Sequence, residues 1–278
     1  MSDTAEHEDL HDYGLEFDRR RMLALMGIAG TGALVAACDP FGPPGHSEPN
    51  RTATAADGST CIKAPAETSG PFPADGSNAK NGSTVNVLAR SGIVRTDLRP
   101  SFGGMKPVAD GVRLDLAITL VNLSKGCVPL SEHAIYVWHC DARGKYSLYD
   151  DEDRNYLRGV AITDAKGEVA FKTIFPGCYS GRWPHIHFEV FASQEKATSG
   201  KDSLLISQFA IPGAIAAALY AGNSGYAASV RYLADISLKK DNVFGDSTAE
   251  QIAAQTLNLI GDATNGFKGS VTVGIASS

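Results

Sequence analysis

Apolar and polar residues alternate along much of the chain from residue 85 onward, and this pattern predicts short β-strands. Between Val112 and Val121 apolar side chains occupy every second position, with polar side chains between them. Residues 133–141 form the next expected strand, and successive side chains place Trp138 and His139 on its opposite faces. The further expected strands are 160–163, 168–174, 184–191, 204–211, 256–260 and 269–275.

Turn residues between these segments indicate the fold class. Asp164-Ala165-Lys166-Gly167 separates two of the expected strands and predicts a β-hairpin, and Pro176-Gly177 ends the second strand. Residues 212–240 are rich in alanine, which is typical of a small helical or irregular insertion. Short strands at this spacing predict an all-β fold, an antiparallel β-sandwich of the immunoglobulin-like type that carries this insertion.

The N-terminus has a different composition and predicts an export signal. Three arginines end at Arg21, and an uncharged, mostly apolar or small run then leads to Cys38. This run is short for a spanning helix, which needs about 20 apolar residues, so a secretory signal over residues 1–37 is favoured over an uncleaved anchor. The arginines resemble a twin-arginine signal, and Leu34 to Cys38 resembles a lipobox. We therefore expect export to the periplasm or exterior, with a possible membrane tether through a lipidated Cys38.

The rest of the chain divides into a linker and one domain. Residues 38–60 are rich in Pro, Gly, Ser and Thr, which predicts a flexible linker, and residues 61–278 are expected to form a single catalytic domain. The whole chain has 25 Lys and Arg against 31 Asp and Glu, a net charge of −6. From Cys38 onward the chain has no basic run, so nucleic acid is not an expected partner.

Four cysteines remain after Cys38, and an even number in an exported chain favours two disulfides. The pairing is left open by the sequence, and buried free thiols are the alternative. The four are Cys61, Cys127, Cys140 and Cys178.

Two histidines on one expected strand form the core of a candidate metal site. His185 and His187 are two residues apart, so their imidazoles project from the same face. Tyr146 and Tyr179 lie close by in turns, and phenolate oxygens suit a hard trivalent cation. Two phenolates and a hydroxide would neutralise Fe(III), with two neutral imidazoles completing the site.

Other ligand sets fit the spacing as well. Glu189 shares the face of His187, so a ferrous or copper site made of His185, His187 and Glu189 is an alternative. Tyr149 and Tyr156 could take the place of Tyr146 on spacing alone.

Seven segments in order resemble the intradiol ring-cleavage dioxygenases, over about residues 67–275. The similarity is greatest to the exported, often lipoprotein-like branch of that family. The segments are 67–72, 137–146, 157–159, 173–179, 181–188, 207–209 and 241–246.

The resemblance implies a site and an activity. Fe(III) would be held by Tyr179 and His187 in axial positions and by Tyr146 and His185 in equatorial ones. The enzyme would open catechol-type rings between the two hydroxyl-bearing carbons with O2, giving cis,cis-muconate-type products.

The resemblance also implies further roles around the metal. Arg182 would stabilise negative charge on the substrate, and Gln208 would supply a hydrogen-bonding group beside it. Trp138 would pack near the equatorial tyrosine, and the substrate wall would consist of Pro71, Phe72, Trp138 and Arg182. Many relatives carry an aromatic residue where this chain has Cys178, so the shape of the pocket is open.

A non-enzymatic binding function is the alternative to a dioxygenase. A non-catalytic exported β-sandwich, such as a transthyretin-like or carbohydrate-binding module, would keep the strands and turns. Such a module has no reason to place two tyrosines beside the His185–His187 pair. The sequence does not select among catechol, protocatechuate, hydroxyquinol and larger phenols, and it leaves the oligomeric state open.

Overall fold

The computed structural model describes residues 52–58 and 60–276. The expected signal segment 1–37, Cys38 and most of the expected linker 38–60 lie outside the described residues. Within the described part of the chain, no helix is both long enough and apolar enough to span a membrane.

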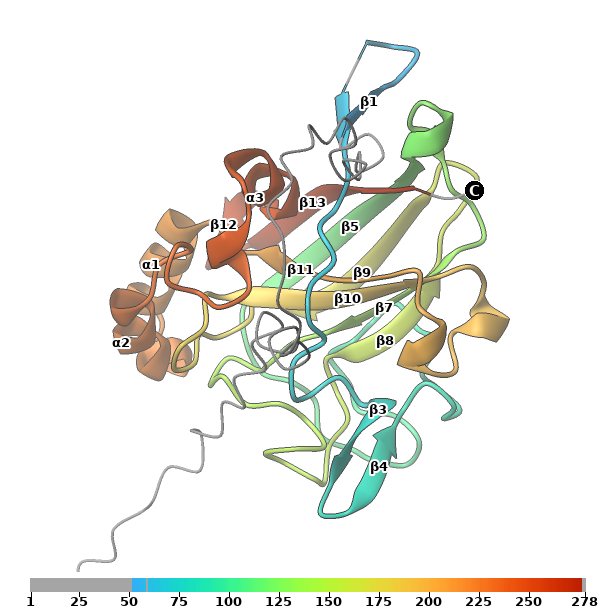
Figure 1. Cartoon of the computed structure of the whole chain (residues 1–278). Coiled ribbons are helices and arrows are strands. Elements are labelled where there is room, and N and C mark those ends of the chain that lie inside the picture. Colours follow the sequence, from blue (N-terminus) through green and yellow to red (C-terminus); the bar gives the residue numbers. More distant parts are fainter. Residues whose placement is uncertain (1–51, 59, 277–278) are drawn as a thin grey trace, which may run out of the picture. The chain divides into compact units, whose positions relative to one another are not determined.

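Two β-sheets form the body of the fold (Figure 1). In the first, the strand order is β11-β10-β7-β8, and all the pairs are antiparallel. In the second, the order is β12-β13-β5-β6, β9 also pairs with β5, and the β13–β5 pair is parallel. The first sheet consists of β7 (Ala134–Trp138), β8 (Arg158–Ile162), β10 (His185–Phe191) and β11 (Leu205–Ala210). The second consists of β5 (Arg113–Asn122), β6 (Val128–Pro129), β9 (Glu168–Ile174), β12 (Asn258–Asp262) and β13 (Gly266–Ile275). The expected β-sandwich is confirmed.

The main hydrophobic core draws side chains from both sheets. On β5 the alternating residues Leu114, Leu116 and Ile118 are fully buried, as the sequence pattern predicts. Ile186 and Phe188 of β10 belong to the same buried cluster. Each side chain of this size contributes roughly 1.5–3 kcal/mol when it leaves water, so the core fixes which face of β10 points inward.

A second hydrophobic cluster includes the opposite face of the four-stranded sheet. Tyr136 and Trp138 of β7 belong to this cluster, together with side chains from residues 74–102. Strands β7 and β10 are consequently buried on both faces. Because side chains alternate along a strand, His185 and His187 point away from the main core and toward this second layer.

The hairpin expected at residues 164–167 is wrong in one respect. The turn itself closes, since Gly167 N–H donates to the Asp164 carbonyl at 2.9 Å. The two strands then part, because β8 pairs with β7 and β9 pairs with β5 in the other sheet. Ala161 of β8 and Phe171 of β9 both belong to the main core. Burial of these apolar side chains between the sheets therefore outweighs hydrogen bonding between β8 and β9.

The insertion expected at residues 212–240 is helical, and a further helix follows it. Figure 1 shows α1 (Gly213–Gly222) and α2 (Ala227–Asp235) together at one side of the two sheets. The sequence pattern did not predict α3 (Ala249–Gln255), which begins with a capping box between Thr248 and Gln251. The 3₁₀ helices are Leu123–Lys125, Gln194–Lys196, Gly200–Asp202, Ser224–Tyr226 and Phe244–Asp246.

Two short hairpins precede the main sheets. β1 (Thr52–Thr54) pairs with β2 (Thr60–Ile62), and β3 (Asp75–Lys80) pairs with β4 (Ser83–Asn86). The first hairpin overlaps the end of the expected linker 38–60. Ala53 and Ala55 pack there against a small buried cluster, which gives this stretch a reason to be ordered.

One disulfide forms, where the cysteine count favoured two. Cys61 on β2 is bonded to Cys127, 66 residues later. Cys140 and Cys178 are free and buried. Each free thiol lies within hydrogen-bond reach of a backbone carbonyl, that of Gly177 for Cys140 and that of Arg182 for Cys178, so neither sulfur is left unsatisfied.

Candidate metal centre

The two histidines of β10 lie on one face of the sheet, as their spacing predicts. His185 and His187 are 1% and 2% exposed, and their Nε2 atoms lie 3.0 Å apart. His185 Nδ1 lies 2.5 Å from the Trp183 carbonyl oxygen, so Nδ1 carries the proton and donates it. The Nε2 lone pair of His185 is therefore available to a metal.

Glycines bring the loops that carry the two tyrosines into contact. Tyr146 follows the turn at Gly144, which has a φ of +81°. A Cβ at Gly144 would lie 3.1 Å from that of Tyr179, and a Cβ at Gly177 would lie 2.6 Å from the Ala142 carbonyl oxygen. Larger residues at either position would push the loops apart, so this packing sets the separation of the two phenols.

Four donor atoms converge at the meeting point of these loops and β10. Tyr146 Oη lies 3.4 Å from Tyr179 Oη, 3.3 Å from His185 Nε2 and 3.1 Å from His187 Nε2. Tyr179 Oη lies 3.2 Å from His185 Nε2. The sixth pair, Tyr179 Oη and His187 Nε2, is not among these contacts. The five short separations bring two phenol oxygens and two imidazole nitrogens to one point.

Burial governs the protonation of the four donors. Burial, with the nearby Arg182 charge, lowers the pKa of His185 well below its usual range, and burial with the neighbouring His185 does the same to His187. Burial raises the pKa of Tyr146 well above its usual range and that of Tyr179 to about 12. Neutral imidazoles are ready ligands, whereas both phenols have to release a proton when a cation binds.

The donor set fits a ferric ion. Metal–ligand bonds of about 2.0–2.1 Å place adjacent donors roughly 3 Å apart, close to the separations observed here. Two phenol oxygens are hard anionic donors once deprotonated, and two neutral nitrogens complete the set. The residues present therefore suit a small, highly charged cation.

Arg182 and Gln208 lie beside the four donors and contact each other. Arg182 Nη2 donates to Gln208 Oε1 at 2.6 Å, and Arg182 Nη1 lies 3.4 Å from His185 Nε2. Gln208 Nε2 donates to the Thr68 carbonyl at 2.9 Å. The two bonds hold the Gln208 amide against Arg182 and use one of its two N–H donors and one of its two acceptor positions.

The residues expected in the substrate wall occupy different layers. Phe72 is partly buried, and its ring centroid lies 4.8 Å from that of Tyr146. Pro71 is exposed beside it. Trp138 is fully buried between Tyr136 and His187, with ring centroids at 4.9 and 4.7 Å. With both ring faces covered, Trp138 supports His187 and is not part of the wall.

The competing tyrosines have other partners. Tyr149 Oη donates to Asn78 and accepts from the backbone of Ala74, both at short distances. Tyr156 Oη donates to an Asp141 carboxylate oxygen at 3.2 Å. Neither hydroxyl is among the contacts of the His185–His187 pair, so Tyr146 takes this place.

The alternative ferrous or copper site lacks its third ligand. Glu189 is fully buried and lies against Asp75; burial, together with this neighbour, raises the pKa of Glu189 to about 9. The Glu189 carboxyl group is not among the contacts of the His185–His187 pair. Among the described residues, no group of three or more His, Cys, Asp or Glu side chains could hold a metal.

The helical insertion holds the loop that carries Tyr179, a role the sequence did not indicate. Tyr220 and Tyr226 donate their hydroxyls to the carbonyls of Pro176 and Phe175. Ser229 Oγ accepts from the Cys178 N–H at 2.9 Å. These bonds satisfy three backbone groups of one buried loop, so they fix the path of the chain into Tyr179.

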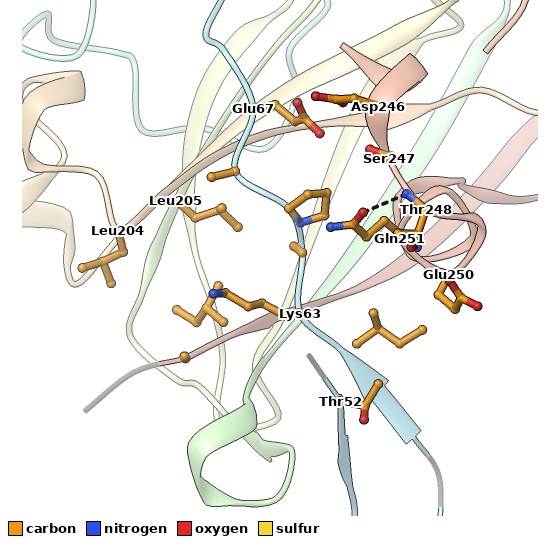
Figure 2. A pocket seen from close by; sticks show the side chains of 16 residues that line it. Thr52, Lys63, Glu67, Leu204, Leu205, Asp246, Ser247, Thr248, Glu250 and Gln251 are labelled. Atoms are coloured by element: carbon orange, nitrogen blue, oxygen red, sulfur yellow. Dashed lines mark hydrogen bonds between the residues drawn. The ribbon is translucent and has the colours of Figure 1, made fainter. Parts of the chain in front are cut away.

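A separate cavity of about 910 Å³ lies beside β11 and α3 and includes none of the four donors (Figure 2). Figure 2 shows Glu67 and Asp246 near each other at one end of it. Burial raises the pKa of Glu67 to about 7. Gln255 Nε2 donates to Glu67 Oε1 at 3.2 Å and lies 3.3 Å from the Gln208 carbonyl oxygen, which links this cavity to β11.

Comparison with known proteins gives consistent similarities. The model of a family described as Dioxygenase matches residues 107–200. The protocatechuate 3,4-dioxygenase beta chain of Burkholderia cepacia is 28% identical over 163 residues, covering 49% of this chain and 67% of that protein. The solved intradiol ring-cleavage dioxygenase from Tetranychus urticae is 22% identical, with a TM-score of 0.58, and covers 78% of this chain and 95% of its own. At that identity, the structural similarity shows the shared fold.

Proposed function

Since the chain belongs to the intradiol ring-cleavage dioxygenases, we propose that it binds Fe(III) through Tyr146, Tyr179, His185 and His187. With O2 it opens catechol-type rings between the two hydroxyl-bearing carbons and yields cis,cis-muconate-type products. The observation that carries this proposal is the convergence of two phenol oxygens and two imidazole nitrogens at 3.0–3.4 Å.

The protein's own groups account for much of the chemistry. When bound, Fe(III) supplies Lewis acidity and a place for the two diol oxygens. A diol has to lose two protons to bind as a dianion; the Tyr179 phenolate oxygen would accept one of them, and a solvent hydroxide the other. Tyr179 suits this role because it is only partly buried, whereas Tyr146 and both histidines are almost inaccessible.

Arg182 supplies fixed positive charge beside the ring. Its Nη1 atom faces the donor cluster at 3.4 Å from His185 Nε2. A preorganised cation in a largely dry site stabilises negative charge as it develops, without waiting for solvent to reorganise. Phe72, which packs on Tyr146, forms an apolar side of the same space and excludes water from it.

Colour and oxygen uptake test this function together. Tyrosinate-to-Fe(III) charge transfer is expected to make the iron-loaded protein burgundy-red, and oxygen is expected to be consumed with at least one of catechol, protocatechuate and hydroxyquinol. Tyr179→Phe is expected to lower turnover about 100-fold or more, within the range of general acid–base contributions. Tyr149→Phe is the matched control, because its hydroxyl bonds to Asn78.

Two outcomes separate this proposal from the alternative of a non-catalytic β-sandwich module. A colourless protein with one iron per chain would remove the tyrosines from the ligand set. A red protein that consumes no oxygen with any of these catechols would keep the metal site and reject the activity.

Export is a second part of the proposal, carried by the arginine-led apolar run that ends at Cys38. Mass spectrometry of the protein from its host is expected to show a mature chain that begins near Cys38. A chain that still begins at Met1 would contradict export by a cleaved signal.

A further inference from the structure

We propose that Asp241 is a positioning residue that aims Arg182 at the candidate metal centre. This inference rests on the proposed function, because it takes Arg182 as the group that stabilises charge on the substrate. Asp241 lies 59 residues from Arg182 in the chain, beyond the helical insertion.

Asp241 is a buried carboxylate with a complete set of donors. It is 2% exposed. Its Oδ2 accepts from Arg182 Nε at 3.0 Å and from the Trp183 N–H at 2.6 Å. Its Oδ1 accepts from the N–H groups of Val243 and Phe244 at 2.8 and 3.0 Å. Four hydrogen-bond donors from two chain segments hold the Asp241 carboxylate in one position. Its negative charge is therefore fixed in place.

The second side of the Arg182 guanidinium is also held. Nη2 donates to Gln208 Oε1 at 2.6 Å, and Gln208 is fixed in turn by the Thr68 carbonyl. A guanidinium group is rigid and planar, so the bonds made by Nε and Nη2 also fix the position of Nη1. Nη1 lies 3.4 Å from His185 Nε2 and is the part of the group that faces the centre.

Arg182 needs such a restraint because of where it lies. It follows Gly181, which is exposed and has a φ of +75°, and it is itself only partly buried. A long arginine side chain has many rotamers available, and holding it in one of them costs conformational entropy. The bond to Asp241 removes most of these rotamers and keeps the cation beside the ring that reacts.

The first test uses iron-free protein and is independent of activity. In the ¹⁵N-labelled full chain, the Arg182 Nε–H resonance is expected to exchange slowly with water. Asp241→Asn is expected to speed this exchange at least tenfold, since the carboxylate partner is gone. Asp246→Asn is the matched control, because Asp246 is an exposed carboxylate in the same segment. Unchanged exchange in Asp241→Asn would overturn the contact.

The second test is a double-mutant cycle on turnover per bound iron. Asp241→Asn is expected to lower kcat about tenfold with a smaller change in KM, and to have no further effect in an Arg182→Ala background. An equal loss in both backgrounds would show that Asp241 does not act through Arg182. Asp241→Glu keeps the charge but displaces it by one methylene group. It is expected to lower kcat in the same Arg182-dependent way. This variant replaces Asp241→Asn in the cycle if the Asn variant does not fold.

The two tests distinguish failure of this inference from failure of the proposed function. If the iron-loaded protein consumes no oxygen with any catechol, the activity is rejected, and the exchange measurement still decides whether Asp241 holds Arg182. If the protein is active and the cycle is additive, only the positioning role is rejected.

Discussion

The indole of Trp138 stacks on the imidazole of His187, with ring centroids 4.7 Å apart and planes inclined by 7°. The two residues are cross-strand partners on β7 and β10. His187 Nδ1 has no hydrogen-bond partner among the described residues. Stacking therefore takes the place of the second hydrogen bond that usually orients a metal-binding histidine.

Replacing this indole is expected to weaken iron binding as well as folding. Trp138→Leu frees the His187 ring to rotate, and we expect iron affinity to fall about tenfold or more, measured by competition with a chelator. Phe188→Leu is the control, because Phe188 lies on the same strand and belongs to the main core. Equal loss of iron from the two variants would mean that general destabilisation, and not stacking, is responsible.

Ser229→Ala is expected to loosen the loop that carries Tyr179. The substitution removes the acceptor of the buried Cys178 N–H, which costs about 1–3 kcal/mol of unfolding free energy. The tyrosinate charge-transfer band of the iron-loaded protein is expected to shift as well, because the phenol is less well placed. Ser224→Ala, at an exposed position of the same insertion, is expected to change neither; a band identical to the wild type in Ser229→Ala would contradict the role of the insertion.

Glu67→Gln is expected to stabilise the protein at alkaline pH. Burial raises the pKa of Glu67 from 4.5 to about 7, so between these values the folded protein keeps a proton that the unfolded chain has released. The stability that Glu67 contributes is full below pH 4.5 and is lost as the pH rises through 7. The variant is expected to gain about 1 kcal/mol at pH 8, reduced by solvent screening, and nothing at pH 4.

Urea unfolding at the two pH values measures this difference. Glu132→Gln, at an exposed position in the loop before β7, is the control and is expected to show no such pH dependence. A gain for Glu67→Gln that is as large at pH 4 as at pH 8 would assign the effect to something other than ionisation.

Removing the Cys61–Cys127 disulfide is expected to destabilise the protein by about 4 kcal/mol, the loop-closure entropy for a separation of this size. The Cys61→Ser/Cys127→Ser variant is expected to unfold at a lower urea concentration, and a reductant is expected to bring the wild type to the same midpoint. A reductant that also shifts the midpoint of the double variant would point to a second bond, one that involves Cys140 and Cys178.

The parts of the fold and site that depend on local pattern could be predicted from the sequence. Apolar and polar alternation located β5, and the two-residue spacing of His185 and His187 placed both on one face of β10. Such a pattern records which side of a strand is buried, and burial is what the sequence encodes most directly.

Features that depend on contacts between residues far apart in the chain could not be predicted from the local sequence pattern. The turn at 164–167 looks like a hairpin locally, but the choice of sheet is made by pairing with β5 and β7. The cysteine count does not show that Cys140 and Cys178 each have a backbone partner. Asp241 carries no local signal, because its partner Arg182 is 59 residues away.

The Cys61–Cys127 bond has a mechanical consequence. Cys61 lies just before the segment that leads through Thr68, which holds Gln208, to Phe72, which packs on Tyr146. A pull on the chain ahead of Cys61 passes through the covalent link into the end of the second sheet at Cys127. Force applied to the chain ahead of Cys61 is therefore shared with the second sheet before it reaches the segment that carries Thr68 and Phe72.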